Sequence, residues 1–155
     1  MGYVVVVLAQ TVILPVVFGM ATLDAYDPWV MSATLGRWFL FWGVGTRLAL
    51  AGIVQLVKPD FTTQSLLGGA PHAAADQVTR ELAFANLAMG LGGIVGSFVG
   101  GALAAALTGG FYLGAAGVRH LGKRGMNVKE TVATWTDLLV CAAMIAYAAA
   151  IIRLH

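Results

Sequence analysis

Charged residues are scarce in this 155-residue sequence. Asp, Glu, Lys and Arg together make up only 10% of the chain, whereas hydrophobic residues make up 59%. Soluble domains carry about 25% charged residues and lack apolar stretches of about 20 residues. Several such stretches occur here, so the sequence predicts an integral membrane protein with little room for a soluble domain. The net charge of +2 is too small and too dispersed to indicate binding of nucleic acid.

Cysteine is nearly absent as well. Cys141 is the single one, which excludes an intrachain disulfide, and a lone thiol does not form a metal site. No pair of His and Cys residues has metal-ligand spacing. The chain also lacks a phosphate-binding glycine loop and a nucleophile motif. We therefore expect no catalytic site, no metal and no cofactor, and the sequence does not favour an enzyme.

Long apolar runs dominate the rest of the chain, and a helix needs about 20 such residues to cross the hydrocarbon core of a bilayer. The stretch from Leu82 to Val118 is free of charge and would be roughly 55 Å long as one helix. We expect it to fold back near Gly100 and Gly101. The sequence thus predicts an all-α bundle with five spans, four being the alternative. The expected spans cover residues 3–23, 35–57, 80–99, 102–119 and 132–154 of a single membrane domain, 1–155.

The basic residues support this count. Five spans bring to one side Lys58, Arg80, Arg119, Lys123, Arg124 and Lys129. The opposite side receives only Arg37 and Arg153. Because Lys and Arg concentrate on cytoplasmic loops, we expect a cytoplasmic N-terminus and a multi-pass protein of the bacterial inner membrane.

Arg47 is the strongest anomaly, since it lies near the middle of the second predicted span, roughly 16 Å from either end. An arginine there costs about 2.5–3.5 kcal/mol and faces the bundle or a cavity. Glu81, His120 and Asp137 lie toward the cytoplasmic side, and we expect Arg47 to pair with Glu81 or Asp137. The cluster serves either as a structural tie or as a site for a ligand or ion. Asn86 is expected to form an interhelical hydrogen bond.

Glycines recur at helical spacing in the third and fourth predicted spans. Gly92, Gly96 and Gly100 follow one another every four residues, and Gly110 and Gly114 repeat the spacing. Such faces allow helix backbones to approach closely. We expect these two spans to pack on each other there, with an interface between protomers as the alternative.

Four segments carry a resemblance to a known family. These are "RWFLFWGVGTRLALAGIVQLVKPDFT", "RELAFANLAMGLGGI", "GGFYLGAAGVRHL" and "TDLL". Together they resemble an uncharacterised family of small bacterial integral-membrane proteins, of the domain-of-unknown-function type, over about Arg37 to Tyr147. The resemblance implies a compact multi-span helical protein, distantly similar to DoxX-type bundles. It implies no activity.

Three functions compete at this point. The first is an accessory or structural subunit of a larger membrane complex, favoured by the small size and the glycine faces. The second is a small transporter or a lipid- or ion-binding protein that uses the polar cluster of Arg47, Glu81, His120, Asp137 and Asn86. The third is a membrane enzyme acting on a lipid or quinone, with His120 and Asp137 as acid and base. The expected partners are the lipid bilayer and other membrane subunits or a second copy, and not nucleic acid.

Overall fold

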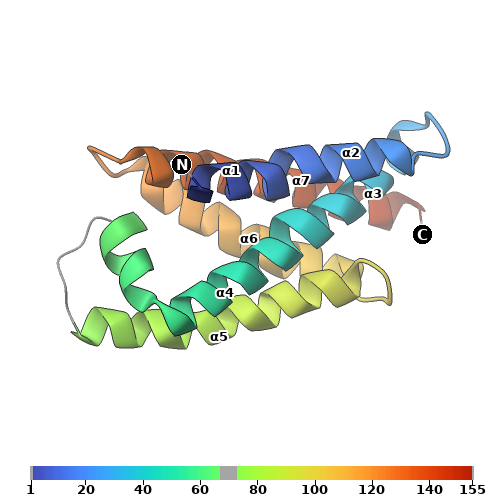
Figure 1. Ribbon diagram of the computed structural model, residues 1–155. Coiled ribbons are helices and arrows are strands. Elements are labelled where there is room, and N and C mark those ends of the chain that lie inside the picture. The colour runs from blue at the N-terminus through green and yellow to red at the C-terminus, as the bar shows by residue number, and fades with distance from the viewer. Residues whose placement is uncertain (1, 67–72, 155) are drawn as a thin grey trace.

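The computed structural model describes residues 2–66 and 73–154, and most of these residues are helical. No strand occurs in these two ranges, which confirms the all-α prediction. The elements are α1 (Gly2–Leu8), η1 (Ala9–Ile13), α2 (Leu14–Ala21), α3 (Pro28–Phe39), η2 (Leu40–Thr46), α4 (Arg47–Val57), η3 (Phe61–Leu66), α5 (Ala73–Gly96), α6 (Ala102–Leu121) and α7 (Val128–Leu154), where η marks π-helical segments. Figure 1 shows them running back and forth along one long axis.

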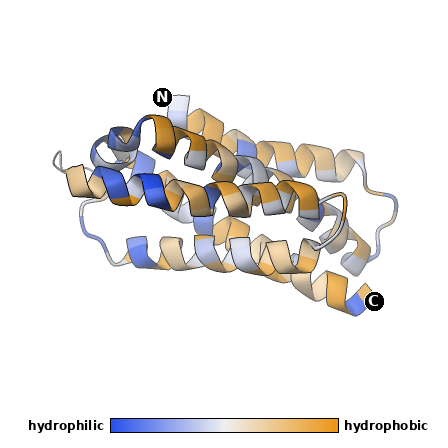
Figure 2. Cartoon of the chain, turned by 90° about the horizontal axis from the view of Figure 1, so that it is seen from below, coloured by the Kyte–Doolittle hydropathy of each residue, from blue (hydrophilic) through white to orange (hydrophobic). Residues whose placement is uncertain are grey.

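Three of the long helices could cross a membrane by length and composition. They are Gly2–Ala21, Pro28–Val57 and Val128–Leu154, searched over the described residues. α5 and α6 are not among them, because both are rich in glycine and α5 carries charged residues near its start. The predicted count of five spans is therefore not confirmed. Figure 2 shows hydrophobic residues along the helices and hydrophilic ones gathered toward the end where α5 and α7 begin.

The predicted turn between the third and fourth spans is present. α5 ends at Gly96 and α6 begins at Ala102. Gly100 and Gly101 have φ angles of 143° and 78°, which side chains disfavour. The second long helix differs from prediction in that it begins at Pro28 rather than near residue 35. The cause is local: the Asp27 carboxylate accepts hydrogen bonds from two backbone N–H groups of the first turn, and proline suits the first helical position.

The segment between α4 and α5 is partly helical. η3 follows α4 within a few residues and packs against α5, where Thr63 Oγ1 donates a hydrogen bond of 2.9 Å to Asp76 Oδ1. Gly68, Gly69 and Pro71, residue types that are expected to interrupt a continuous helix, lie outside the described residues.

Close packing of α5 depends on glycines other than the predicted ones. A Cβ on Gly90 would overlap the backbone nitrogen of Ala49, and one on Gly93 would lie 2.9 Å from the Cα of Gly45. α5 therefore packs its backbone against the second long helix. The predicted stripe is wrong at Gly92, around which a Cβ would meet nothing within 4 Å.

The other predicted glycines divide between different roles. Gly100 lies in the turn, and a Cβ on Gly96 would come 3.1 Å from Ala105 of α6, so Gly96 alone of that stripe touches the expected partner. Gly110 and Gly114 pack against α7, where a Cβ would meet Met144 or Cys141. The prediction that they face α5 is wrong, because this face of α6 packs against α7.

The core lies where η2 crosses α6 and α7. Leu40 and Val44 are fully buried there, and a Cβ on Gly43 would lie 3.0 Å from Val140. The remaining core residues are Leu48, Ala106, Leu113, Met144 and Tyr147. This crossing fixes the position of η2 and hence of Arg47, which follows it directly.

Candidate functional site

An ion pair between Arg47 and Asp137 joins the second and last long helices. Arg47 Nη2 lies 2.6 Å from Asp137 Oδ1, and the two side chains are only 10% and 9% exposed. Of the two partners expected for Arg47, the structure selects Asp137. Arg47 directly follows the π-helical segment η2, and such widened turns occur frequently at functional sites.

The pair leaves hydrogen-bonding capacity unused. Arg47 Nη1 is buried and has no hydrogen-bond partner within the described part of the chain, and the same holds for Asn86 Oδ1. Among the described residues, Asp137 Oδ1 has its short contact with Arg47 as its ion pair and no further hydrogen-bond partner. Buried polar groups without partners are rare because their desolvation is costly. Arg47 Nη1 could therefore donate, and Asn86 Oδ1 accept, an additional hydrogen bond.

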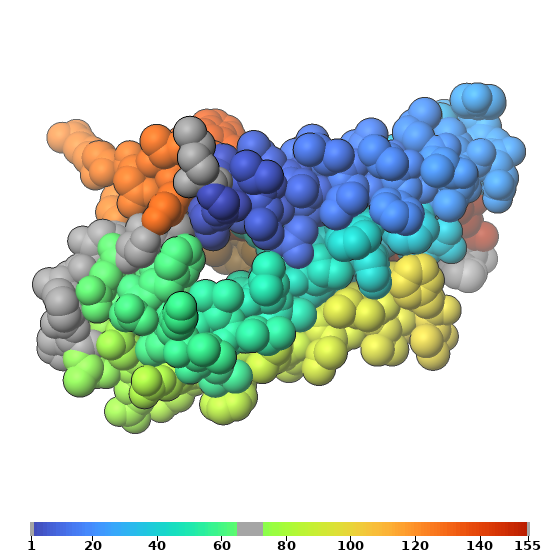
Figure 3. Space-filling view, viewed as in Figure 1, coloured from blue at the N-terminus to red at the C-terminus, as the bar shows by residue number. Residues whose placement is uncertain are grey.

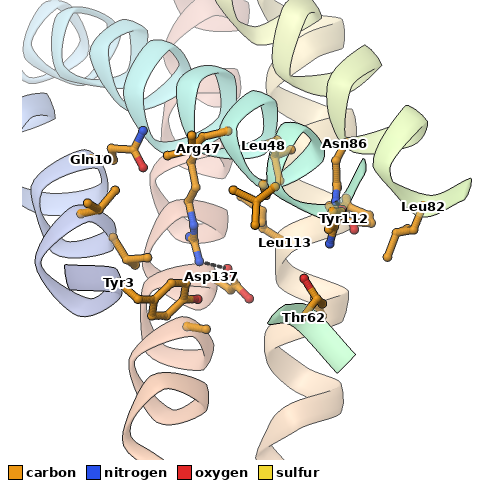
Figure 4. Close-up of a pocket in the computed structure, with 18 of the residues that line it drawn as sticks. Tyr3, Gln10, Arg47, Leu48, Thr62, Leu82, Asn86, Tyr112, Leu113 and Asp137 are labelled. Atoms are coloured by element: carbon orange, nitrogen blue, oxygen red, sulfur yellow. Dashed lines mark hydrogen bonds and ion pairs between the residues drawn. The ribbon is translucent and has the colours of Figure 1, made fainter. Parts of the chain in front are cut away.

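A cavity of about 330 Å³ adjoins the ion pair. This volume lies within the roughly 300–1,000 Å³ typical of ligand pockets. Figure 4 shows Arg47 and Asp137 on one side of it and Asn86 with Tyr112 on the other. Most of the lining is apolar. The polar residues that line it are Tyr3, Gln10, Arg47, Gln55, Thr62, Asn86, Tyr112, His120 and Asp137.

Asn86 has the interhelical role expected of it. Its Nδ2 donates a hydrogen bond of 2.6 Å to Gln55 Oε1, which ties α5 to α4. Gln55 was missed by sequence reasoning, although a signal was present. It lies eight residues after Arg47, and at 3.6 residues per turn such positions share a helix face.

Gln10 lies shortly before Pro15 in the first apolar run, a pattern that fits either a polar notch lining a cavity or a simple bend of the helix. Its Nε2 donates a hydrogen bond of 3.0 Å to Thr46 Oγ1, one residue before Arg47. This contact fastens the first long helix to the second beside the ion pair. Tyr3 and Thr62 were missed because tyrosine and threonine are ordinary residues near helix ends.

His120 also lines the cavity, but its ion-pair partner, Glu130, does not line it. His120 Nδ1 lies 3.3 Å from Glu130 Oε1, to which Lys123 Nζ donates a hydrogen bond of 2.8 Å. Glu130 is buried, with 2% exposure. Its spacing with Thr134 and Asp137, at i, i+4 and i+7, marks one polar face of α7 and could have revealed it.

Glu81 does not belong to the cluster. It is exposed on α5, where its Oε1 accepts a hydrogen bond of 3.4 Å from Gln77. The alternative that Arg47 pairs with Glu81 is therefore wrong. Glu81 lies five residues from the buried Asn86, which places the two about 140° apart around the helix axis.

The arrangement suits binding of a small molecule with an apolar body and a polar end. The described residues hold no group of three or more His, Cys, Asp and Glu side chains that could bind a metal ion. Among the described residues that line the cavity, Thr62 is the only serine or threonine.

Fold and site together define an all-α protein with three helices that could span a membrane and a cavity built on an ion pair between helices. No protein-family model, curated protein or solved structure matches the chain. The resemblance to small DoxX-like membrane proteins therefore stays a prediction.

Proposed function

We propose that this protein is a small multi-pass membrane protein that binds a lipid-like ligand in the cavity beside Arg47 and Asp137. The observation that carries the proposal is the combination of a largely apolar cavity with a buried guanidinium whose Nη1 lacks a hydrogen-bond partner among the described residues. An arginine is expensive within hydrocarbon and marks a functional site there. Its neutralisation by Asp137 explains how it is tolerated, and the unused Nη1 supports a ligand.

The proposed topology has five spans in the inner membrane of a bacterium, with a cytoplasmic N-terminus. The basic residues Lys58, Arg80, Arg119 and Lys123 support it, because each lies near a helix end that faces the same end of the bundle. The glycines of α5 and α6 lower hydropathy without adding charge. α5 packs against the helix Pro28–Val57, α6 packs against Val128–Leu154, and α5 and α6 also pack against each other.

A matched pair of substitutions on α6 tests the binding function. Ala116 lines the cavity, whereas its neighbour Ala115 is exposed on the outside of the bundle. We expect Ala116→Phe to fill part of the cavity and to remove a small molecule that co-purifies with the wild-type protein in mild detergent. Ala115→Phe keeps that molecule. The measurement is native mass spectrometry, with thermal unfolding to show that both variants fold.

The proposal fails under two results. One is a bound molecule that Ala116→Phe retains at full stoichiometry. The other is a wild-type protein that holds no small molecule and gains no thermal stability from any added lipid.

A second candidate is an accessory subunit of a larger membrane complex. The exposed residues Ala88 and Gly92 of α5 favour it, because a Cβ on Gly92 would meet nothing within 4 Å. A small-x-x-x-small face allows close approach of another helix. Gentle affinity purification is expected to recover a partner at fixed stoichiometry, and Gly92→Leu to lose it while remaining folded. A protein that purifies alone and monodisperse contradicts this role.

A further inference from the structure

We infer that the ligand is a neutral amphiphile whose polar end both donates and accepts hydrogen bonds, and that it reaches the cavity sideways from the bilayer, between α1 and the α4–η3 segment. This inference rests on the proposed binding function and specifies its ligand.

The side opening follows from the elements that line the cavity. Tyr3 and Val6 of α1 line it from one side, and Leu50 of α4 and Phe61 of η3 from the other. Figure 3 shows the hollow between these segments on the flank of the bundle. Val6 and Leu50 are also 42% and 41% exposed, so the rim of the opening is apolar. In a spanning bundle such a flank faces lipid, which favours a ligand already dissolved in the bilayer.

The charges around the cavity favour a ligand without net charge. The formal charges of Arg47 and Asp137 cancel across their 2.6 Å contact. His120, at the edge of the cavity, is held by Glu130, which also accepts from Lys123. A ligand with a net charge would compete with one member of the Arg47–Asp137 pair and leave the other uncompensated in a medium of low dielectric constant.

The hydrogen-bonding groups define the polar end of the ligand. Among the described residues, Arg47 Nη1 is a buried donor and Asn86 Oδ1 a buried acceptor without a hydrogen-bond partner, and the Asn86 side chain also lies within hydrogen-bonding reach of the Tyr112 side chain. The side chains of Tyr3 and Thr62 lie at the same cavity and carry hydroxyls, which donate and accept (Figure 4). An amide or alcohol satisfies both kinds of group, whereas an ester only accepts.

The size of the cavity limits how much of the ligand it holds. A volume of about 330 Å³ corresponds to about ten water molecules at roughly 30 Å³ each. The polar end and the first part of a hydrocarbon chain fit, and the remainder of the chain passes through the side opening into the bilayer.

Four probes with the same 18-carbon chain test the ligand class. Oleamide is neutral and both donates and accepts, methyl oleate is neutral and only accepts, oleate is an anion and oleylammonium is a cation. Binding is measured as the rise in unfolding temperature with ligand mole fraction in dodecylmaltoside micelles. We expect oleamide to bind at least tenfold more tightly than each of the others. Ala116→Phe abolishes this binding and Ala115→Phe retains it.

A double variant separates charge from hydrogen bonding. Arg47→Gln with Asp137→Asn keeps the cavity neutral but removes the guanidinium donor. Oleamide binding is expected to weaken about tenfold, and any binding of methyl oleate to weaken as well, because both carbonyl groups accept from that donor. If oleate or oleylammonium binds best and Ala116→Phe removes that binding, the inference of a neutral ligand is overturned and the binding function stands. If none of the probes binds, the inferred ligand class is overturned, and the binding function fails with it when the wild-type protein also holds no co-purified molecule. If Ala116→Phe leaves the binding unchanged, both are contradicted.

The side opening has its own test. Leu50 lines the cavity at its rim, whereas Ile53 on the same helix is 52% exposed and does not line it. We expect Leu50→Trp to slow association of a brominated oleamide at least fivefold, read as quenching of tryptophan fluorescence, relative to Ile53→Trp. Equal association rates in the two variants overturn access by this route.

Discussion

Removing one charge of the Arg47–Asp137 pair is expected to destabilise the protein far more than removing both. Asp137→Asn leaves the guanidinium without a counter-charge, and Arg47→Gln leaves the carboxylate alone. The contact is 2.6 Å long and both side chains are about nine-tenths buried, so solvent compensates the remaining charge only in part. In the double variant, two neutral amides remain that can hydrogen-bond to each other.

The magnitude follows from this burial. Breaking a buried ion pair by removal of one partner costs about 3–5 kcal/mol, whereas replacement of both charges is often close to neutral. We therefore expect each single variant to lose about 3–5 kcal/mol of unfolding free energy. The double variant is expected to lose less than either single variant. Its deviation from additivity measures the coupling between the two side chains.

The assay is unfolding by sodium dodecyl sulfate in dodecylmaltoside micelles, followed by tryptophan fluorescence, for all four members of the cycle. Arg153→Gln serves as the control for loss of a positive charge, because Arg153 is exposed near the C-terminus. Losses that simply add in the double variant would refute the reasoning, since they would show that the two groups are stabilised independently.

Three further predictions concern packing, the second polar cluster and topology. Gly90→Leu is expected to cost more than about 2 kcal/mol in the same unfolding assay, because its side chain would overlap the backbone of α4, whereas Gly92→Leu leaves stability unchanged; equal effects would contradict the packing described. Glu130→Gln should lose about 1–3 kcal/mol, because Lys123 and His120 lose the buried negative charge that they face, whereas Glu81→Gln stays within about 0.5 kcal/mol; a silent Glu130→Gln would count against that cluster. With five spans, a reporter that works only outside the cytoplasm should be active when it is fused to the C-terminus. Activity of a reporter that works only in the cytoplasm would instead favour four spans.

Fold class could be predicted because it depends on composition. Long apolar runs exclude strands at membrane depth except in closed barrels, and the glycines at 100 and 101 interrupt a run too long for one helix. The helix boundaries were less predictable. Asp27 caps α3 earlier than the apolar pattern suggests, because the cap depends on one side chain and not on hydropathy.

The candidate site could be predicted in part. Arg47 is identified by its position alone, since a charge in the middle of an apolar run requires compensation. Asp137 and Glu81 were equally available as partners in the sequence. The hydrogen bond between Asn86 and Gln55 depends on two helices being adjacent, so only one of its members could be recognised.

Helical, apolar character and an arginine inside a long helix follow from the amino-acid sequence alone. The rotation of each helix about its axis does not, and it became known only from the packing of the folded chain. That rotation turns Asn86 inward and Glu81 outward, and places Gly93 rather than Gly92 at the helix contact. Where a helix spans a bilayer, both the protein interior and the lipid around it accept apolar side chains. A helix that is apolar all round carries no periodic signal of its buried face, so packing of specific shapes and pairing of specific charges set its orientation.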